Sequence, residues 1–294
     1  MPGIKTASVP QPAAESTVKL KIGKSEWDKA VQVQVTGDVA EPEFHQCRIV
    51  AESLATEQLK TIITPLPAHL YKAYRQNLKK NYHVLDTLFP TTLIEFHTPT
   101  KTTLLTSLEF LSLAAVHTSA SPPPLDFSEI AKQQVEKYVK ELGNPVVYLT
   151  LADGDEVLGE KIVIELFAKT CPKSTEHFLK LLERYVGVKL KRVVEGGWAE
   201  FGDILDESGH PVREPILEDE NFIHSHEAYT LSYISPCAHQ NTTPFFITLA
   251  PVPTFDRRFV VFGRVLFGTG VCGRVQGAKG EVKIAEAGVW KGVG

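Results

Sequence analysis

Cysteine and histidine are the residue types in this chain that could carry redox or metal chemistry. The four cysteines are scattered, at Cys47, Cys171, Cys237 and Cys272. None forms a C-x-x-C pair or a zinc-finger cluster with histidine, so we expect the reduced, buried thiols of an intracellular protein. His224 and His226 stand beside the acidic run 218–220. That grouping is compatible with a metal site but is more typical of a solvated loop, and we predict neither a metal nor a cofactor.

Composition limits the class of protein. The chain has 294 residues, of which 43% are hydrophobic and 22% charged, with a net charge of −4. These values are ordinary for soluble globular proteins, and the length predicts about two domains. The absence of a basic patch argues against nucleic acid or an anionic membrane as a partner. No apolar run reaches the roughly 18 residues of a membrane span. The N-terminus lacks the apolar core of a signal peptide, so we expect a cytoplasmic protein whose partners are other proteins.

The first part of the chain predicts a flexible tail and a small α/β domain. Residues 1–28 are rich in Pro, Ala, Ser and Lys and show no periodicity, which is typical of a flexible tail. Over residues 29–118 the hydrophobic period alternates between 2 and 3.6, which predicts the order β-α-β-α-β-β-α. The expected elements are Ala30–Thr36, Glu43–Leu54, Thr61–Leu66, Ala68–Tyr82, Thr91–Phe96, Thr102–Leu105 and Ser107–His117.

This order resembles the thioredoxin/glutaredoxin family. Phe89–Ile94 looks like the Pro-Thr segment that opens the third strand of that family, and the resemblance implies a cis peptide bond at Pro90. The redox thiols are not matched, because their place reads Ala40–Phe44 and contains two glutamates. Cys47 falls a turn inside the expected helix, where a low-pKa thiolate is not expected. We predict a thioredoxin-like domain without redox cysteines, used for contacts; a working thiol oxidoreductase is the alternative.

Residues 119–143 predict a connection between two domains. Thr118–Pro124 is small, polar and then Pro-rich, as linkers are. Leu125–Leu142 predicts an amphipathic helix that ends at Gly143. The helix either packs on a domain or presents a face to a partner.

The rest of the chain carries a set of motifs. Thr243–Val265 has two apolar runs broken by a Pro-rich turn, which predicts two buried strands flanking a loop. Further motifs are Asn144–Leu149, Leu158–Phe167, Cys171–Phe178, Glu218–Phe222 (Glu-Asp-Glu-Asn-Phe) and Val260–Val265. Together they resemble the cyclophilins, the cyclophilin-type peptidyl-prolyl isomerases, over about half of the chain. The resemblance implies that residues 144–290 form a mostly β domain, an eight-stranded antiparallel barrel capped by two helices.

The resemblance also implies where an active site would lie. In that family an arginine donates to the prolyl nitrogen, an apolar pocket holds the proline ring, and a glutamine places the substrate carbonyl. Arg192 falls on the arginine, and Phe246 falls on a pocket phenylalanine. The other matched positions differ from the family: Gly197 for a phenylalanine, Trp198 for methionine, Glu200 and Pro244 for glutamines, Thr254 for tryptophan, with Phe255 next to it, and Phe259 for histidine.

These departures predict isomerase activity that is very weak or absent. Glu200, if it faces the pocket, can pair with the Arg192 guanidinium and draw it away from the prolyl nitrogen. Glycine at position 197 removes roughly 1.5–3 kcal/mol of apolar burial for a substrate ring. Trp198 could refill that space, either blocking the pocket or reshaping it. Arg192 is then a catalytic residue of a degenerate site or a surface arginine in an ion pair.

Two features narrow the resemblance further. The pairing of the two domains with Gly197-Trp198, and the run Asp256–Val260, are similar to ciliary isomerase-like proteins regarded as inactive. The relatives of that group are cyclophilin-type subunits of axonemal radial spokes. The resemblance implies a structural subunit of a ciliary or flagellar axoneme, with axonemal proteins as partners. The alternative is an active peptidyl-prolyl isomerase with altered specificity.

Overall fold

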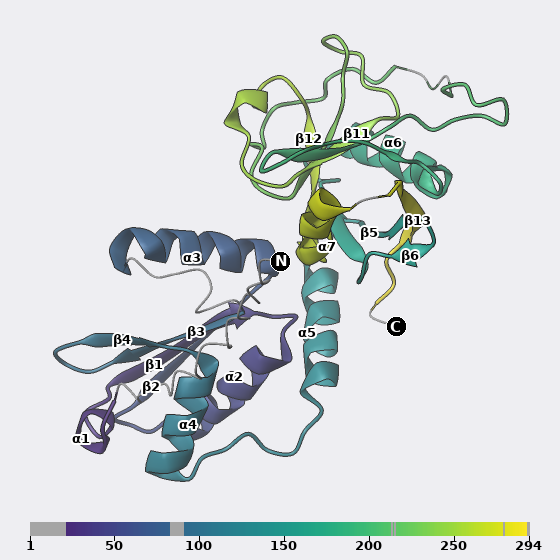
Figure 1. Cartoon of the computed structure of the whole chain (residues 1–294). Helices are drawn as coiled ribbons and strands as arrows, with labels where there is room; N and C mark the ends of the chain where they lie inside the picture. The colour runs from purple at the N-terminus through teal and green to yellow at the C-terminus, as the bar shows by residue number, and fades with distance from the viewer. Residues whose placement is uncertain (1–21, 83–90, 213, 215, 279, 293–294) are drawn as a thin grey trace, which may run out of the picture.

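The computed structural model describes residues 22–82, 91–212, 214, 216–278 and 280–292. Two domains are joined by helix α5 (Phe127–Leu142), which lies between them (Figure 1). Pro90, for which we expected a cis bond, and most of the expected tail lie outside the described residues.

The N-terminal domain is a four-stranded sheet with helices on both faces. Its elements are α1 (Lys24–Trp27), β1 (Gln32–Asp38), α2 (Pro42–Leu54), β2 (Lys60–Leu66), α3 (Ala68–Tyr82), β3 (Thr92–His97), β4 (Thr102–Leu105) and α4 (Ser107–Thr118). The strand order is β2-β1-β3-β4, and only the β1–β2 pair is parallel. Helices α2 and α4 cover one face and α3 covers the other (Figure 1). The predicted α/β order is therefore observed, with α1 added in front.

The expected boundary of the tail is corrected by α1. Trp27 is buried, and its ring stacks on Phe96 at 5.1 Å and on Phe110 at 6.4 Å between centroids. Ile22 is buried in the same cluster. Residues 22–28 thus belong to the folded domain, because Ile22 and Trp27 bury their apolar side chains in its core.

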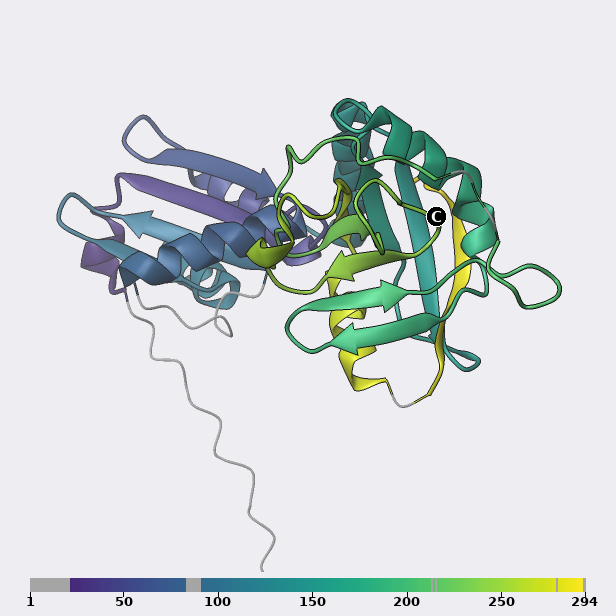
Figure 2. The ribbon, with the colours of Figure 1, turned by 90° about the horizontal axis from the view of Figure 1, so that it is seen from above.

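The C-terminal domain is a curled antiparallel sheet of nine strands with helices packed on it. Its elements are β5 (Val146–Asp153), β6 (Glu156–Val157), β7 (Ile162–Leu166), α6 (Pro172–Leu181), β8 (Leu190–Val194), β9 (Trp198–Phe201), β10 (Thr230–Tyr233), β11 (Phe245–Thr248), β12 (Val261–Phe267), α7 (Thr269–Arg274) and β13 (Val282–Val289). Eight strands follow the order β13-β5-β7-β12-β10-β11-β9-β8, and β6 pairs with β5 alone. Figure 2 shows the curl of this sheet from above.

The ends of the curled sheet approach each other. Lys189, just before β8, forms an isolated antiparallel bridge with Lys283 of β13. The amide of Ile284 donates to the carbonyl of Val188 at 2.9 Å, and the amide of Gly187 donates to the carbonyl of Ile284 at 2.8 Å. The sheet therefore differs from the expected eight strands by the two-residue β6. Its ends are joined by one isolated bridge and by the two neighbouring backbone hydrogen bonds.

An aromatic core fixes the strands that carry the candidate site. Phe178 of α6 lies 5.0 Å from the Tyr185 ring and 5.4 Å from the rings of Phe245 and Phe262. These four side chains are fully buried. Tyr185 keeps a hydrogen bond, donating its hydroxyl to the carbonyl of Thr243 at 2.8 Å. The core thus anchors β11 and β12 on α6, as buried aromatic clusters do.

Helix α5 packs on both domains. One part of it contacts α2. Tyr138, Val139 and Leu142 pack against the buried cluster of Val146, Val163 and Leu266 in the C-terminal domain. Of the two expectations for this helix, the described contacts favour packing.

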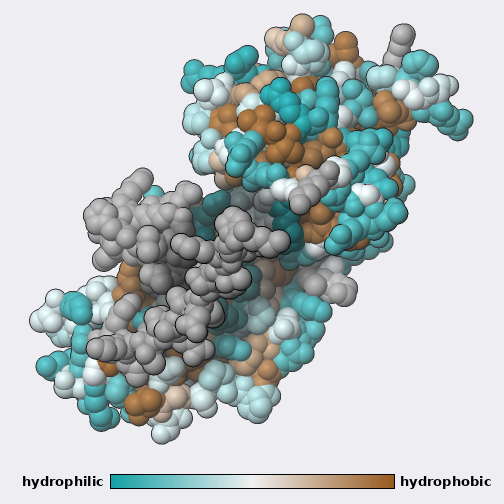
Figure 3. All heavy atoms as spheres, viewed as in Figure 1, coloured by the Kyte–Doolittle hydropathy of each residue, from teal (hydrophilic) through white to brown (hydrophobic). Residues whose placement is uncertain are grey.

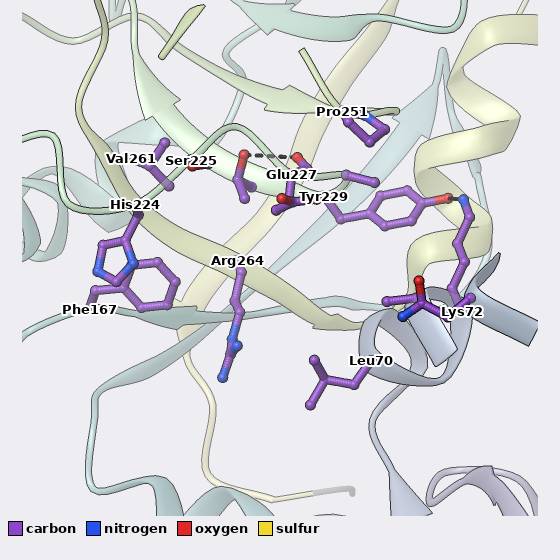
Figure 4. Close-up of a pocket in the computed structure, with 14 residues that line it drawn as sticks. Leu70, Lys72, Phe167, His224, Ser225, Glu227, Tyr229, Pro251, Val261 and Arg264 are labelled. Atoms are coloured by element: carbon purple, nitrogen blue, oxygen red, sulfur yellow. Dashed lines mark hydrogen bonds between the residues drawn. The ribbon is translucent and has the colours of Figure 1, made fainter. Parts of the chain in front are cut away.

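A second contact between the domains is made by α3. The ammonium of Lys72 donates to the Tyr229 hydroxyl at 2.9 Å and lies 4.6 Å from the centre of that ring. Tyr229 has φ of 67°, a strained value for an aromatic residue, and this conformation brings its ring to α3. Beside this contact is a cavity of about 650 Å³, which Arg264 and Leu70 enter from opposite domains (Figure 4).

Candidate functional site

Three neighbouring strands bring the matched residues of the site together. The register places Arg192 of β8 opposite Glu200 of β9, and Glu200 opposite Phe246 of β11. Side chains at paired positions point to the same face of a sheet, so these three form one row across it. Trp198, two residues before Glu200, lies on the same face. The strand register, which spacing along the chain could not reveal, assembles the row.

The guanidinium of Arg192 has two neighbours within this row. Its Nε lies 4.0 Å from Glu200 Oε2, and the guanidinium carbon lies 5.1 Å from the centre of the Trp198 ring. Glu200 is only 13% exposed at its side chain and also pairs with the ammonium of Lys191 at 3.5 Å. The carboxylate thus stands at the position matched to the family's glutamine and attracts the guanidinium toward itself.

The position matched to a pocket phenylalanine cannot easily take a larger residue. Gly197 is buried in the turn between β8 and β9. A Cβ added there would meet Val194 Cγ1 at 3.1 Å and the Val194 carbonyl oxygen at 3.3 Å. The carbonyl of Gly197 is itself held, accepting from the amide of Leu249 at 2.7 Å. A larger residue at position 197 would therefore require Val194 to move by a few tenths of an ångström.

Aromatic side chains cover the remaining pocket phenylalanine. Phe246 is 2% exposed. Its ring lies 5.5 Å from that of Phe255 and 5.6 Å from that of Phe259, in edge-on contacts. Phe255 in turn meets the Trp198 ring at 4.7 Å. The four aromatic residues form one cluster, and the ring that would line a proline pocket is not accessible from solvent.

The remaining two sequence-matched positions, Pro244 and Thr254, belong to neither the row nor the aromatic cluster. Pro244 is buried immediately before β11, where its carbonyl accepts from the amide of Ile234 at 3.0 Å. Thr254 is exposed in a 3-10 turn, and its neighbour Phe255 makes the ring contacts.

A buried histidine, His226, packs against Phe246 of the aromatic cluster. This corrects our expectation that His226 lies in a solvated loop. The His226 side chain is fully buried, and its ring stacks on Phe246 at 5.8 Å with an interplanar angle of 13°. Its Nδ1–H donates to Asp256 Oδ1 at 2.9 Å, and Nε2 accepts from the Ser232 hydroxyl at 3.1 Å. The backbone amide of His226 also donates to Asp256 Oδ1, at 2.7 Å. The sequence carried no signal for this arrangement, because the three residues come from separate loops and strands.

The charge state of this arrangement follows from its burial. Burial lowers the pKa of His226, although the hydrogen bond to Asp256 partly opposes that shift. The hydrogen bonds from the His226 backbone and ring lower the pKa of Asp256. A neutral imidazole beside an ionised carboxylate fixes the Nδ1–H tautomer. The group therefore holds the 256–259 turn against Phe246, and it has a structural role.

Replacing His226 by alanine should destabilise the C-terminal domain by about 2–4 kcal/mol. The change opens a cavity under Phe246 and leaves the buried Ser232 hydroxyl without its partner. Urea denaturation measures the loss. His224→Ala is the matched control, because His224 is part-exposed and should cost below about 1 kcal/mol. Equal losses in the two variants would contradict the structural role of His226.

The four cysteine side chains differ in burial, with three buried and one exposed. Burial raises the pKa of Cys47 and of Cys272 to about 12, and it also raises the pKa of Cys171. Cys237 is exposed. A thiolate is the reactive form, so Cys47 lacks the property that a redox thiol needs.

Iodoacetamide should therefore modify one thiol of the native chain, at Cys237. After denaturation all four cysteines should react, because burial no longer protects them. Intact-mass spectrometry counts the adducts, and Cys237→Ser should take the native count to zero. Fast native labelling of Cys47 would revive the thiol oxidoreductase hypothesis.

Two further findings concern the part of the chain that the structure describes. Within it, no three or more Cys, His, Asp or Glu side chains are grouped to hold a metal ion. Its helices are all too short or too polar to cross a bilayer. On the face shown in Figure 3, the described apolar side chains of the C-terminal domain form patches interrupted by hydrophilic ones.

Comparison with known proteins agrees with this geometry. The family "Cyclophilin type peptidyl-prolyl cis-trans isomerase/CLD" matches residues 148–289. This part of the chain is a cyclophilin-type domain. The curled antiparallel sheet fits that family.

Individual relatives extend the comparison beyond the cyclophilin domain. A human protein named "Probable inactive peptidyl-prolyl cis-trans isomerase-like 6" is 24% identical over 83% of this chain and 85% of its own length. The cattle protein of the same name is 28% identical over 51% of this chain and 53% of its own length. "Peptidyl-prolyl cis-trans isomerase D" of Mycosarcoma maydis is 31% identical over 50% of this chain and 44% of its own length. The chain spans about half the length of the cattle and fungal relatives, and it is homologous to the human protein through both domains.

Proposed function

We propose that this chain is a noncatalytic, cyclophilin-like interaction subunit with little or no prolyl isomerase activity. The observation that carries the proposal is the 2% exposure of Phe246 beneath Phe255 and Phe259. Catalysis of rotation about an X-Pro bond needs a site that binds the twisted state more strongly than the planar one. A ring that solvent cannot reach offers no wall for a proline side chain.

The charges next to Arg192 also argue against catalysis. A donor to the prolyl nitrogen acts by being positioned beforehand and free of competing acceptors. Here the carboxylate of Glu200 lies 4.0 Å from Arg192 Nε, and Trp198 holds the face of the guanidinium. The substrate nitrogen would compete with an ionised carboxylate for the same donor. The names of the human, cattle and mouse relatives, which include the word "inactive", are consistent with this proposal.

The alternative is an active isomerase of altered specificity. In its favour, the Arg192 side chain is 57% exposed and could reach a bound peptide. A prolyl isomerisation assay separates the two functions. Turnover near that of active cyclophilins, lost in Arg192→Ala, would overturn the noncatalytic proposal.

We also infer that the N-terminal domain is thioredoxin-like and serves as a contact surface. The sheet order β2-β1-β3-β4, with one parallel pair, supports this inference. So does the position after β1, which holds Glu41 and Pro42 in place of reactive thiols. In the C-terminal domain, the eight-strand path and the Lys189–Lys283 bridge support a barrel of the cyclophilin kind.

The partners that we propose are axonemal proteins of a cilium or flagellum, with the radial spoke as the assembly. The support is the resemblance of Gly197-Trp198 and Asp256–Val260 to that group. Stepwise salt extraction of isolated axonemes, followed by mass spectrometry, tests the assignment. Co-extraction with spoke subunits is expected. Recovery of the chain only in the soluble fraction, before extraction, would contradict it.

A further inference from the structure

A cavity of about 390 Å³ lies at the edge of the aromatic cluster and outside the row of Arg192. Three loops form its walls: the one before His226, the one after β10, and the turn before β12. The side chains that line it include Phe222, Pro236, His239, Arg257, Arg258 and Phe259. Phe259 also belongs to the aromatic cluster, so the cavity adjoins the covered proline pocket.

Two arginines give this cavity its charge. Arg257 and Arg258 are both exposed, and neither guanidinium is hydrogen-bonded or ion-paired to a residue that the structure describes. Of the nearby carboxylates, Asp219 also lines the cavity, but its side chain is only 3% exposed and lies 3.3 Å from the His239 ring. Asp219 accepts from the amide of His239 and from the Asn241 side chain, both at 2.8 Å. Asp256 faces His226, as described above.

Two residues that line the cavity have an uncommon backbone conformation. Arg257 has φ of 62° and His239 has φ of 60°, both in the left-handed region that glycine occupies without strain. An arginine at such a position carries a conformational cost that a glycine would avoid. Strained residues of this kind gather at sites where the side chain is used.

The cavity also has an apolar edge. Phe222 is 40% exposed, which is high for a phenylalanine, and it lies in the wall with Pro236 and Phe259. Paired cations beside exposed aromatic surface suit an anionic side chain carried on a polypeptide, since the apolar edge can cover neighbouring residues of that chain. Two guanidinium groups match the charge of a phosphate dianion, and arginine binds phosphate through parallel hydrogen bonds.

We propose that this cavity binds a phosphorylated serine or threonine side chain of a partner protein. The inference rests on the proposed function in taking a protein as the partner. The cavity shares Phe259 with the aromatic cluster, and it shares no residue with the Arg192–Glu200–Phe246 row. Phosphorylation of the partner then controls docking through Arg257 and Arg258.

The test is an NMR titration of the ¹⁵N-labelled full chain with O-phospho-L-serine. Saturable shifts of the backbone amides of Cys237, His239 and Arg257 are expected, with L-serine causing none. In Arg257→Gly/Arg258→Gln the affinity should fall at least tenfold; glycine suits the left-handed backbone, so this variant should keep the fold. Lys137→Ala/Lys140→Ala removes the same charge from exposed positions of α5 and should bind as the wild type does.

Three results would overturn the proposal: no saturable shift at these amides, unchanged affinity in the arginine double variant, or equal affinity for L-glutamate, which would make a carboxylate the ligand. The isomerase assay is independent of this test. An inactive chain that ignores O-phospho-L-serine overturns the docking proposal alone. An active isomerase that binds it overturns the noncatalytic function alone.

Discussion

Combining Glu200→Gln with Trp198→Met should raise prolyl isomerase turnover from a level near background by roughly 10–100-fold. The glutamine removes the carboxylate that competes for the Arg192 guanidinium, and the methionine removes the ring that lies over it. A gain of that size corresponds to about 1.4–2.8 kcal/mol of transition-state stabilisation. The measurement is kcat/KM for a proline-containing tetrapeptide. We expect the variant to stay below active cyclophilins, because Phe255 and Phe259 still cover Phe246.

Two further variants make this result specific. Glu195→Gln removes the same charge from an exposed turn near Arg192 in sequence and should leave turnover unchanged. Adding Arg192→Ala to the double variant should abolish the gain. If Glu195→Gln rescued activity as well as the double variant, the register-based pairing of Glu200 with Arg192 would not be the cause of inactivity.

Raising the pH from 4 to 8 should destabilise the N-terminal domain through Asp38, by at most about 4 kcal/mol. Burial raises the pKa of Asp38 from 3.8 to about 7, against the hydrogen bond from the Ala40 amide, and the charges of Glu41 and Glu160 add to the rise. The folded state therefore holds a proton that the unfolded state releases near pH 4. The resulting stability is present at low pH and is lost as the pH rises through about 7.

Asp38→Asn should remove this dependence. Asparagine can still accept from the Ala40 amide, and it carries no charge at any pH, so the variant should gain up to about 4 kcal/mol at pH 8 relative to wild type. Thermal unfolding of the N-terminal domain at pH 5 and pH 8 measures the difference. Asp28→Asn is the control, because the Asp28 side chain is 58% exposed and should respond little. A wild-type curve that follows the variant at both pH values would show that Asp38 is ionised in the fold throughout.

Asp38 lies close to the junction of the two domains. Glu160, which raises its pKa, comes from the loop before β7 in the cyclophilin-type domain. Lys72 and Tyr229 join the domains at a second place, and α5 packs on both. The Lys72–Tyr229 hydrogen bond and the packing of α5 are therefore the contacts that hold the two domains together in the described residues.

The sequence by itself determined the elements and the family. Periodicity located β1 to β4 and α2 to α5 within one or two residues, because each has an apolar face that must be buried. The motif Glu218–Phe222 and the run Val260–Val265 pointed to the cyclophilin-type domain, which the family match over residues 148–289 confirms. The matched positions also named Arg192, Glu200 and Phe246, although nothing along the chain could show that they form one row.

The tertiary structure decided which of the matched residues are neighbours and which of them are buried. Strand register placed Glu200 between Arg192 and Phe246, and register depends on pairing between strands that no local pattern specifies. The burial of His226 and its bonds to Asp256 and Ser232 arise from three separate segments, so the loop seemed solvated from sequence alone. Trp27 joined the core for the same reason, since its partner Phe96 lies far along the chain. The accessibility of a side chain depends on how its neighbours pack, and here Phe255 and Phe259 pack on Phe246 and leave it 2% exposed.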